Sequence, residues 1–458
     1  MADFNAKFQY LEAGGAVSQE GACHAQFDAQ TFALTPESAP SMAFDLGDLD
    51  AVTAADWEIR LPLYTGNTIL LRQMGKAYET LAHDLLDAYR DRALQCLLLE
   101  DLQEIARYNG AFELTLAGSP PRSGPAEIRL FKSNLAVLPT TSQSFQWRLA
   151  DVDSVRFDSN SWETVLQAGP DQLKFTKLAK RTEEFASQVR EAISALATQS
   201  AQALHGIFPF LTPDQLQKTA GLLREGQSAS VAKLAAINPK IPSALTANAV
   251  DKDLKPYYDD LVARNGNGML YAGFKLIRQE AEDGGTSQGS DDDANTESAS
   301  SSLTNSPTYQ VTNSSAAPDA DTGSPEVLYW FFFPIPGNVV AWEASSKSGR
   351  ATYFFRLVDP AQAAQLRDPS QAPGLIDAAV RRLNRVLGML NFRRRPIYLS
   401  DDQLDMDAKF HRYAIAARRL PDLRQVRASF LGRAIHSSHE AWQEQVKGII
   451  PLSGRALS

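Results

Sequence analysis

The sequence predicts an α+β protein in which one β-rich unit occurs twice in tandem, ahead of a helical connector and a third, mixed unit. Three observations support this prediction. Residues 44–52 (FDLGDLDAV) are similar to residues 147–155 (WRLADVDSV), 103 positions later in the chain. In each copy, segments with strand character precede one amphipathic helical segment. A later stretch, 279–325, is dominated by Ser, Asp, Thr, Gly and Asn.

The duplication is ordered along the chain, which is typical of a repeated domain. Trp57 matches Trp162 after a two-residue insertion, and Phe44 matches Trp147. The further matched segments are 32–36 with 135–139 and 74–76 with 178–180. Equivalent aromatic residues in two copies most simply predict equivalent core packing, and the alternative is a binding groove.

Each copy is expected to hold about five to seven short strands and then one helix. The helix of the first copy is indicated by Leu81 and Leu85, and that of the second by Phe185 and Val189, all at helical spacing. In the second copy the segments with strand character are 127–131, 135–138, 145–149, 162–166 and 172–176.

The pattern Leu-x-Asp-Val/Leu-Asp-x-Val occurs at 46–52 and again at 149–155. Together with the order of strands and closing helix, it resembles the pleckstrin-homology-like (PH-like) fold of bacterial proteins, over residues from about 20 to 200 taken as two copies. The resemblance implies two tandem PH-like β-barrel or sandwich domains, each closed by a C-terminal helix. It also implies a module that binds phosphoinositides, peptides or proteins, and it implies no enzyme substrate.

Phosphoinositide binding in the eukaryotic members relies on basic residues in the loop between the first two strands. The corresponding loops hold at most one basic residue; they are 36–40, 139–144 and the earlier 118–122. The resemblance therefore favours a protein partner over a lipid.

After the repeats the chain is expected to become helical. Thr212-Pro-Asp-Gln215 has the signature of a helix start, and Gly226 of a helix end. Ser228 is expected to cap a second short helix that runs through Ala236.

The last unit is expected to begin with a strand at 268–277, before the acidic stretch. That stretch holds too few aliphatic residues to offset the entropy of ordering, so it is expected to be disordered. Strands resume at 327–333, 339–343 and 351–357 as an antiparallel meander. Helices are expected from Pro373 to the C-terminus, with a capping box at Ser400–Gln403 before the helical segment 404–419.

A chain of 458 residues is too long for one core. The predicted division is a PH-like domain 1 at 1–108, a PH-like domain 2 at 109–200, a helical connector at 201–265 and an α+β C-terminal domain at 266–458, with the disordered acidic loop at 279–325.

Charge is unevenly distributed in a chain whose net charge is −9. The segment 279–326 has ten acids and no bases, whereas 375–433 has 13 Lys and Arg against six acids. The two cysteines, Cys23 and Cys96, are too few for a disulfide framework, and no signal peptide or membrane-length apolar run is present. A cytoplasmic location is expected.

Arginines of the basic region are the candidate anion-binding or partner-binding residues, because a guanidinium is a planar donor that fits carboxylates and phosphates. The candidate residues are Arg381, Arg382, Arg385, Arg393, Arg394, Arg395, Arg418 and Arg419, and the wider cluster adds Arg424, Arg427 and Arg433. Three interpretations remain open: ion pairs with local acids, docking within the chain or to a protein, and binding to nucleic acid or anionic lipid.

Other motifs indicate no catalytic residue, metal or cofactor. His436 and His439 are three apart, which is not the spacing of catalytic zinc motifs, and they are expected on a solvent-facing helix turn. The glycine-rich segment 265–268 precedes a strand, where a phosphate cradle needs a helix to follow. The acidic run 291–293 lacks the alternating ligands of a calcium loop.

The predicted function is a cytosolic, non-catalytic scaffold or adaptor that binds protein partners, with the basic C-terminal helices docking an acidic surface. The acidic loop 279–325 is a candidate intramolecular ligand of that basic face. The alternatives are an enzyme with an anion-binding site in the C-terminal domain, lined by Tyr329, Trp330, Trp342 and Glu343, and a protein attached peripherally to membranes.

Overall fold

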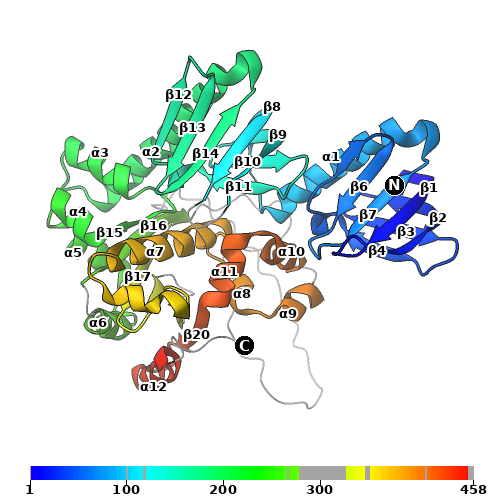
Figure 1. The fold of residues 1–458 in the computed structure, drawn as a ribbon. Helices are drawn as coiled ribbons and strands as arrows, with labels where there is room; N and C mark the ends of the chain where they lie inside the picture. The colour runs from blue at the N-terminus through cyan, green and yellow to red at the C-terminus, as the bar shows by residue number, and fades with distance from the viewer. Residues whose placement is uncertain are drawn as a thin grey trace, which may run out of the picture.

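The structure, a computed structural model, describes residues 2–99, 102–116, 120–265, 268–277, 326–345, 351–407 and 410–451. It confirms a mixed α+β fold built largely from antiparallel sheets. Figure 1 shows the N-terminal repeat in blue, the second repeat in cyan and green, and the C-terminal helices in yellow to red beneath them. The acidic loop 279–325, with the acidic run 291–293, lies outside the described residues.

Repeat 1 is a seven-stranded antiparallel sheet followed by one helix. Its elements are β1 (Ala2–Leu11), β2 (Val17–Phe27), β3 (Thr31–Pro36), β4 (Met42–Asp45), the 3-10 turn η1 (Leu46–Asp48), β5 (Thr53–Ala55), β6 (Glu58–Pro62), β7 (Thr68–Arg72), η2 (Gly75–Ala77) and α1 (Tyr78–Cys96).

Repeat 2 has the same elements in the same order. They are β8 (Glu104–Thr115), β9 (Arg122–Phe131), β10 (Asn134–Pro139), β11 (Phe145–Arg148), η3 (Leu149–Asp151), β12 (Ser154–Asp158), β13 (Glu163–Ala168), β14 (Asp171–Thr176), η4 (Ala179–Arg181) and α2 (Thr182–Ile207).

The two sheets share one strand order, which confirms the duplication. It is β4-β3-β2-β1-β7-β6-β5 in repeat 1 and β11-β10-β9-β8-β14-β13-β12 in repeat 2. Each repeat has its own apolar core beneath its closing helix, where Leu85 of α1 and Phe185 of α2 are fully buried. Alternating apolar residues along the strands supply the rest of each core.

Sheet 3 is a six-stranded antiparallel sheet of order β15-β16-β17-β18-β19-β20. Its strands are β15 (Ser228–Ser230), β16 (Tyr271–Ile277), β17 (Glu326–Ile335), β18 (Val339–Ser345), β19 (Ala351–Arg356) and β20 (Phe430–Ile435). The meander of β17, β18 and β19 is confirmed.

Helices cover both faces of sheet 3. On one face lie α3 (Pro213–Leu222), α4 (Val231–Ile237), α5 (Ile241–Ala249), α6 (Lys255–Arg264) and α12 (His439–Ile449), and on the other lie α7 (Ala372–Met389), α8 (Arg395–Tyr398), α9 (Asp401–Met406), α10 (His411–Arg419) and α11 (Pro421–Ser429). The 3-10 segment η5 (Pro360–Arg367) precedes α7. Because both faces are covered, consecutive aromatic residues of β17 are buried, with Trp330 toward one layer and Phe331 toward the other.

The core between sheet 3 and α7 to α11 also receives residues of both repeats. Leu97, at the end of α1, and Phe131 and Ala136, on strands of repeat 2, are buried in it. The hydroxyl of Thr53 donates to the Thr140 carbonyl 3.0 Å away, across the junction of the repeats. The repeats are therefore packed onto the C-terminal unit.

Both predicted capping boxes are present. Thr212 and Gln215 cap α3 reciprocally, and Ser400 and Gln403 do the same for α9. The predicted helix start at Ser228 is wrong, because Ser228 pairs with Gly273 in β15 and the helix starts at Val231.

Three further expectations are wrong. The segment after Pro373 is not helical to the end, because β20 pairs with β19 at the edge of sheet 3. The segment 404–419 does not form one helix, since α9 ends at Met406. Trp57 and Trp162 are not core residues: their side chains stand at hairpin tips, 64% and 52% exposed. Trp147 is buried, and Phe44 stacks on Phe32, as core packing predicts.

Candidate functional site

The repeated Leu-x-Asp pattern forms a 3-10 turn in each repeat. Leu46 of η1 and Leu149 of η3 are fully buried in the cores of their repeats and anchor the turns. The carboxylates of Asp48 and Asp151, at equivalent positions, lie outside the cores of their repeats, and their side chains are only 17% and 15% exposed in the whole chain. Both turns face arginines from the rest of the chain.

The turn of repeat 1 is held by two consecutive arginines at the end of α10. Arg419, 2% exposed, donates to the carbonyl of Gly47 at 2.5 Å and to the Tyr89 hydroxyl at 3.3 Å. Arg418 lies 3.1 Å from Asp48. Burial raises the pKa of the Asp48 carboxyl above its usual range, and the positive charge of Arg418 acts against that rise.

The turn of repeat 2 is held in a similar way. Arg224, before β15, donates to the carbonyls of Ala150 at 3.0 Å and Val152 at 2.6 Å. Arg385 of α7 lies 3.9 Å from Asp151 and 3.2 Å from Asp171. Four arginines therefore attach equivalent turns of the two repeats to the rest of the molecule.

Arg385 also closes a contact within the C-terminal helices, because its Nη1 lies 3.0 Å from Asp422. Its guanidinium thus serves three carboxylates. Arg148, beside η3, donates to the carbonyls of Gly226 at 3.0 Å and Asn384 at 3.4 Å. Arg148 and Arg224 belong to the same junction. The sequence does not identify them, because their partners are about 75 to 235 positions away and are brought close only by the fold.

The remaining arginines of the predicted set lie elsewhere. The guanidinium of Arg381 lies against the turn at Gly169 of repeat 2, and Arg382 is half-buried on the same helix. Arg393 donates to the Tyr413 hydroxyl. Arg394 is buried over the Tyr353 ring, and Arg395 lies over the Phe410 ring, with guanidinium carbons 5.8 Å and 5.6 Å from the ring centroids. The eight residues do not form one continuous face.

A cationic pocket lies where repeat 1 meets α10 and α11. Its volume is about 330 Å³, near the lower end of the roughly 300–1,000 Å³ range of small-molecule sites. It is lined by Tyr64, Asp401, Ala417, Arg418, Arg424 and Arg427.

Arg418, Arg424 and Arg427 differ in whether their guanidinium groups form ion pairs with carboxylates of the chain. Arg427 lies 2.6 Å from Asp401, and Arg418 is shared between Asp48 and Asp405. The Arg418 Nε is buried and has no hydrogen-bond partner among the described residues. Arg424 is exposed, and its guanidinium has no ion pair in the part of the chain that the structure describes. The sequence had placed Arg424 only in the wider cluster.

The four residues of the alternative enzyme site lie on two faces of sheet 3. Trp330 and Trp342 are buried against α7 to α11, whereas Tyr329 packs on the other layer. Glu343, fully buried, accepts a hydrogen bond from the Thr352 hydroxyl at 2.5 Å. These side chains therefore do not line one pocket.

His436 completes a buried polar cluster with Glu343. Its Nε2 lies 3.3 Å from the Glu343 carboxylate and 2.9 Å from the Thr352 hydroxyl, and its ring stacks on Tyr257 with centroids 4.0 Å apart. The expected solvent-facing helix turn is wrong for His436, because it follows β20 and precedes the cap of α12 at Ser438. Among the described residues no group of three or more His, Cys, Asp and Glu is arranged to hold a metal ion.

The exposed tryptophans mark a matching corner in each repeat, where a hairpin tip meets the start of the closing helix. Trp57 has a φ of 62° and Trp162 a φ of 53°, in the left-handed region that bulky side chains rarely adopt. This conformation costs about 1–2 kcal/mol for an L-residue. In repeat 1 the Trp57 ring contacts the Tyr78 ring, with centroids 5.1 Å apart.

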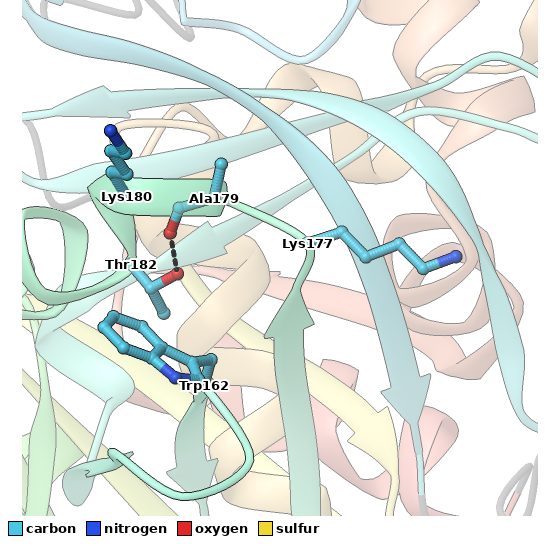
Figure 2. Close-up of a pocket in the computed structure, with 5 residues that line it drawn as sticks. All are labelled: Trp162, Lys177, Ala179, Lys180 and Thr182. Carbon is cyan, nitrogen blue, oxygen red and sulfur yellow. Dashed lines mark hydrogen bonds between the residues drawn. The ribbon is translucent and has the colours of Figure 1, made fainter.

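In repeat 2 the same corner contains a pocket of about 380 Å³, lined by Trp162, Lys177, Ala179, Lys180 and Thr182. Figure 2 shows the indole of Trp162 on one side and the turn η4, followed by Thr182, on the other. The Thr182 hydroxyl donates to the Ala179 carbonyl at 3.0 Å, so its methyl group is left to line the pocket.

In the described part of the chain, no helix is long and apolar enough to cross a membrane. Cys23 and Cys96 are both buried, free thiols. Burial raises the pKa of Cys96 to about 12, so this thiol stays protonated at neutral pH.

Comparisons with known proteins give no family. No protein-family model matches the chain, and no curated protein matches it. Among solved structures, the chain is similar to the crystal structure of N-terminally truncated linker-DH/PH domains of p115-RhoGEF, with 10% sequence identity and a TM-score of 0.17. The match covers 26% of this chain and 46% of that chain, so it spans less than half of that structure. A TM-score this low does not establish a shared fold.

Proposed function

We propose that the chain is a cytoplasmic, non-catalytic scaffold that binds a protein partner, built on two PH-like repeats fixed to a C-terminal unit. The common strand order of the repeats and their closing helices support the PH-like assignment. The two free thiols, Cys23 and Cys96, support the location, because unpaired buried cysteines are usual in reducing compartments.

The observation that carries the proposal is the cationic pocket at Arg424. Arg418 and Arg427 are neutralised in part by Asp48, Asp405 and Asp401. Arg424 forms no ion pair among the described residues, although burial raises the pKa of the nearby Asp50 carboxyl and the charge of Arg424 acts against that rise. An acidic side chain of a partner would bind there through the planar guanidinium fork. The exposed ring of Tyr64 would supply apolar contact beside it.

This assignment divides the basic C-terminal region by role. Arg385, Arg418 and Arg419 hold the repeats, and Arg424 is available to an outside partner. The acidic loop 279–325 remains a proposed competitor for the same charge. Tethering would give such a loop a high effective concentration.

Affinity capture from the native cytosol tests the proposal, with mass spectrometry to identify the retained proteins. The intact chain is compared with Arg424→Glu, with the charge-preserving Arg424→Lys, and with Arg156→Glu. Arg156 is an exposed residue of β12 in repeat 2, so it matches the change in charge but not the location.

A partner retained by the intact chain and by Arg156→Glu, lost with Arg424→Glu and partly recovered with Arg424→Lys supports the proposal. Retention of the same proteins by all four chains contradicts it. Binding through exposed charges should also weaken as salt rises, because screening shortens the reach of the interaction.

A further inference from the structure

We propose that the corner of repeat 2 at Trp162 binds an aromatic side chain presented by an acidic peptide. This site is distinct from the pocket at Arg424, because it is formed within repeat 2 alone. The proposal therefore goes beyond the proposed function and is tested independently of it.

The comparison of the two repeats indicates what the pocket accepts. Tyr78 and Thr182 are the first residues of the closing helices α1 and α2, so they occupy equivalent positions. In repeat 1 the tyrosine ring lies against Trp57, and in repeat 2 the smaller threonine leaves space beside Trp162. In repeat 1 a tyrosine ring thus occupies the position that is equivalent to the open pocket of repeat 2.

The backbone of the corner is alike in both repeats. Lys177 and Ala179 have φ values of 57° and 54°, and the equivalent Gln73 and Gly75 have values of 58° and 61°. Non-glycine residues in this region are strained, and such strain is concentrated at functional sites. The shared geometry means that a ring can lie against Trp162 in the way that the Tyr78 ring lies against Trp57.

Charge favours an acidic peptide. Lys177 and Lys180 are exposed, and neither has an ion pair or side-chain hydrogen bond among the described residues. Figure 2 shows the two lysine side chains leaving the pocket in different directions, away from the indole. Acidic residues on either side of the bound ring would meet them. Glu163 and Glu183 follow the pocket residues Trp162 and Thr182 in sequence, and Lys174 lies 3.8 Å from Glu163, which offsets part of the negative charge there.

The pocket walls suit an aromatic ring. The indole of Trp162 offers a face for stacking, and Ala179 and the Thr182 methyl are apolar. The indole is 52% exposed, and its one ring contact among the described residues is an edge contact with Phe157, at a centroid distance of 6.2 Å. A second ring would therefore cover apolar surface that water now contacts.

The test uses two blocked, fluorescein-labelled peptides, Glu-Glu-Tyr-Glu-Glu and Glu-Glu-Ala-Glu-Glu, titrated with the full chain by fluorescence anisotropy. The expected result is that the tyrosine peptide binds about tenfold more tightly than the alanine peptide. Thr182→Tyr fills the pocket with a ring of the chain itself, and should abolish this difference. Trp162→Asn should do the same, and asparagine tolerates the left-handed backbone there.

The reciprocal variant is Tyr78→Thr, which opens the corner of repeat 1 and should add a second tyrosine-dependent site. The same titrations in an Arg424→Glu chain separate this proposal from the proposed function, since the tyrosine-dependent part of binding should persist.

Equal affinity for the two peptides, or a difference unaltered by Thr182→Tyr in a folded chain, would overturn the proposal. Tight binding of Lys-Lys-Tyr-Lys-Lys would overturn its charge preference. Self-association that is lost with Trp162→Asn in analytical ultracentrifugation would instead make a second copy of the chain the occupant.

Discussion

Asp48 and Asp151 occupy equivalent positions in the two repeats, and each carboxylate lies beside an arginine from the C-terminal helices. The distances are 3.1 Å from Asp48 to Arg418 and 3.9 Å from Asp151 to Arg385. The carbonyls that precede them, of Gly47 and Ala150, also accept hydrogen bonds from arginines. The segment in which the two copies are most similar is thus the segment by which both are attached.

The first prediction concerns the buried arginine of this attachment. Arg419→Met should lower the free energy of unfolding by about 2 kcal/mol, because it leaves the buried Gly47 carbonyl without a donor. Arg424→Met is the matched control on the next helix, and an exposed residue should change stability by less than about 0.5 kcal/mol. Urea unfolding measures both. Equal effects would show that Arg419 does not hold repeat 1.

The second prediction uses two glycines of α7. A methyl group at Gly388 would overlap the guanidinium of Arg148, whereas one at Gly374 meets nothing within 4 Å. Gly388→Ala should therefore lower the free energy of unfolding by about 1–2 kcal/mol, because Arg148 would lose its hydrogen bonds to the carbonyls of Gly226 and Asn384. Gly374→Ala should raise the free energy of unfolding by about 0.5 kcal/mol, because alanine has the higher helix propensity. A thermal melt in which Gly388→Ala is the more stable of the two would contradict the arrangement at η3.

The third prediction concerns alkaline pH. The pKa of Cys96 is raised by burial from 9.0 to about 12 in the folded chain. The unfolded chain then loses this proton first, so the stabilisation is complete below pH 9.0 and is lost as pH rises toward about 12. Between those values the loss is on the order of 4 kcal/mol.

Cys96→Ala removes the titrating group, so its free energy of unfolding should fall less steeply between pH 9 and pH 11, a range of about two units. Other groups titrate equally in both chains and cancel in the difference. Parallel curves for the two chains would show that Cys96 is not the cause.

Much of the fold could be predicted from the sequence. The match of 44–52 with 147–155 predicts the duplication. The capping-box patterns predict the starts of α3 and α9, because the hydrogen bonds of a capping box join residues that are close in sequence. These signals are local, or they repeat along the chain. The strand β20 was missed because its pairing with β19 joins residues nearly 80 positions apart and its six residues carry little pattern of their own.

The site was predicted less well. The sequence identified the arginines by composition, but Arg385 and Arg418 also pair with Asp171 and Asp48 of the repeats, which are more than 200 and 350 positions away. The two tryptophans are predicted to be core residues because they occupy equivalent positions in the two copies. Their place at hairpin tips depends on strand ends that the sequence could not fix to within a residue.

The measurement that tests the division of roles most directly is a titration of fluorescein-labelled octaglutamate with the full chain, in low salt and in about 0.5 M salt. The account predicts that Arg424→Glu weakens binding about tenfold or more, that Arg424→Lys and Arg156→Glu change it much less, and that salt removes the difference. Equal affinity of the intact chain and Arg424→Glu in low salt would contradict the central claim that Arg424 is the arginine free to bind an acidic partner.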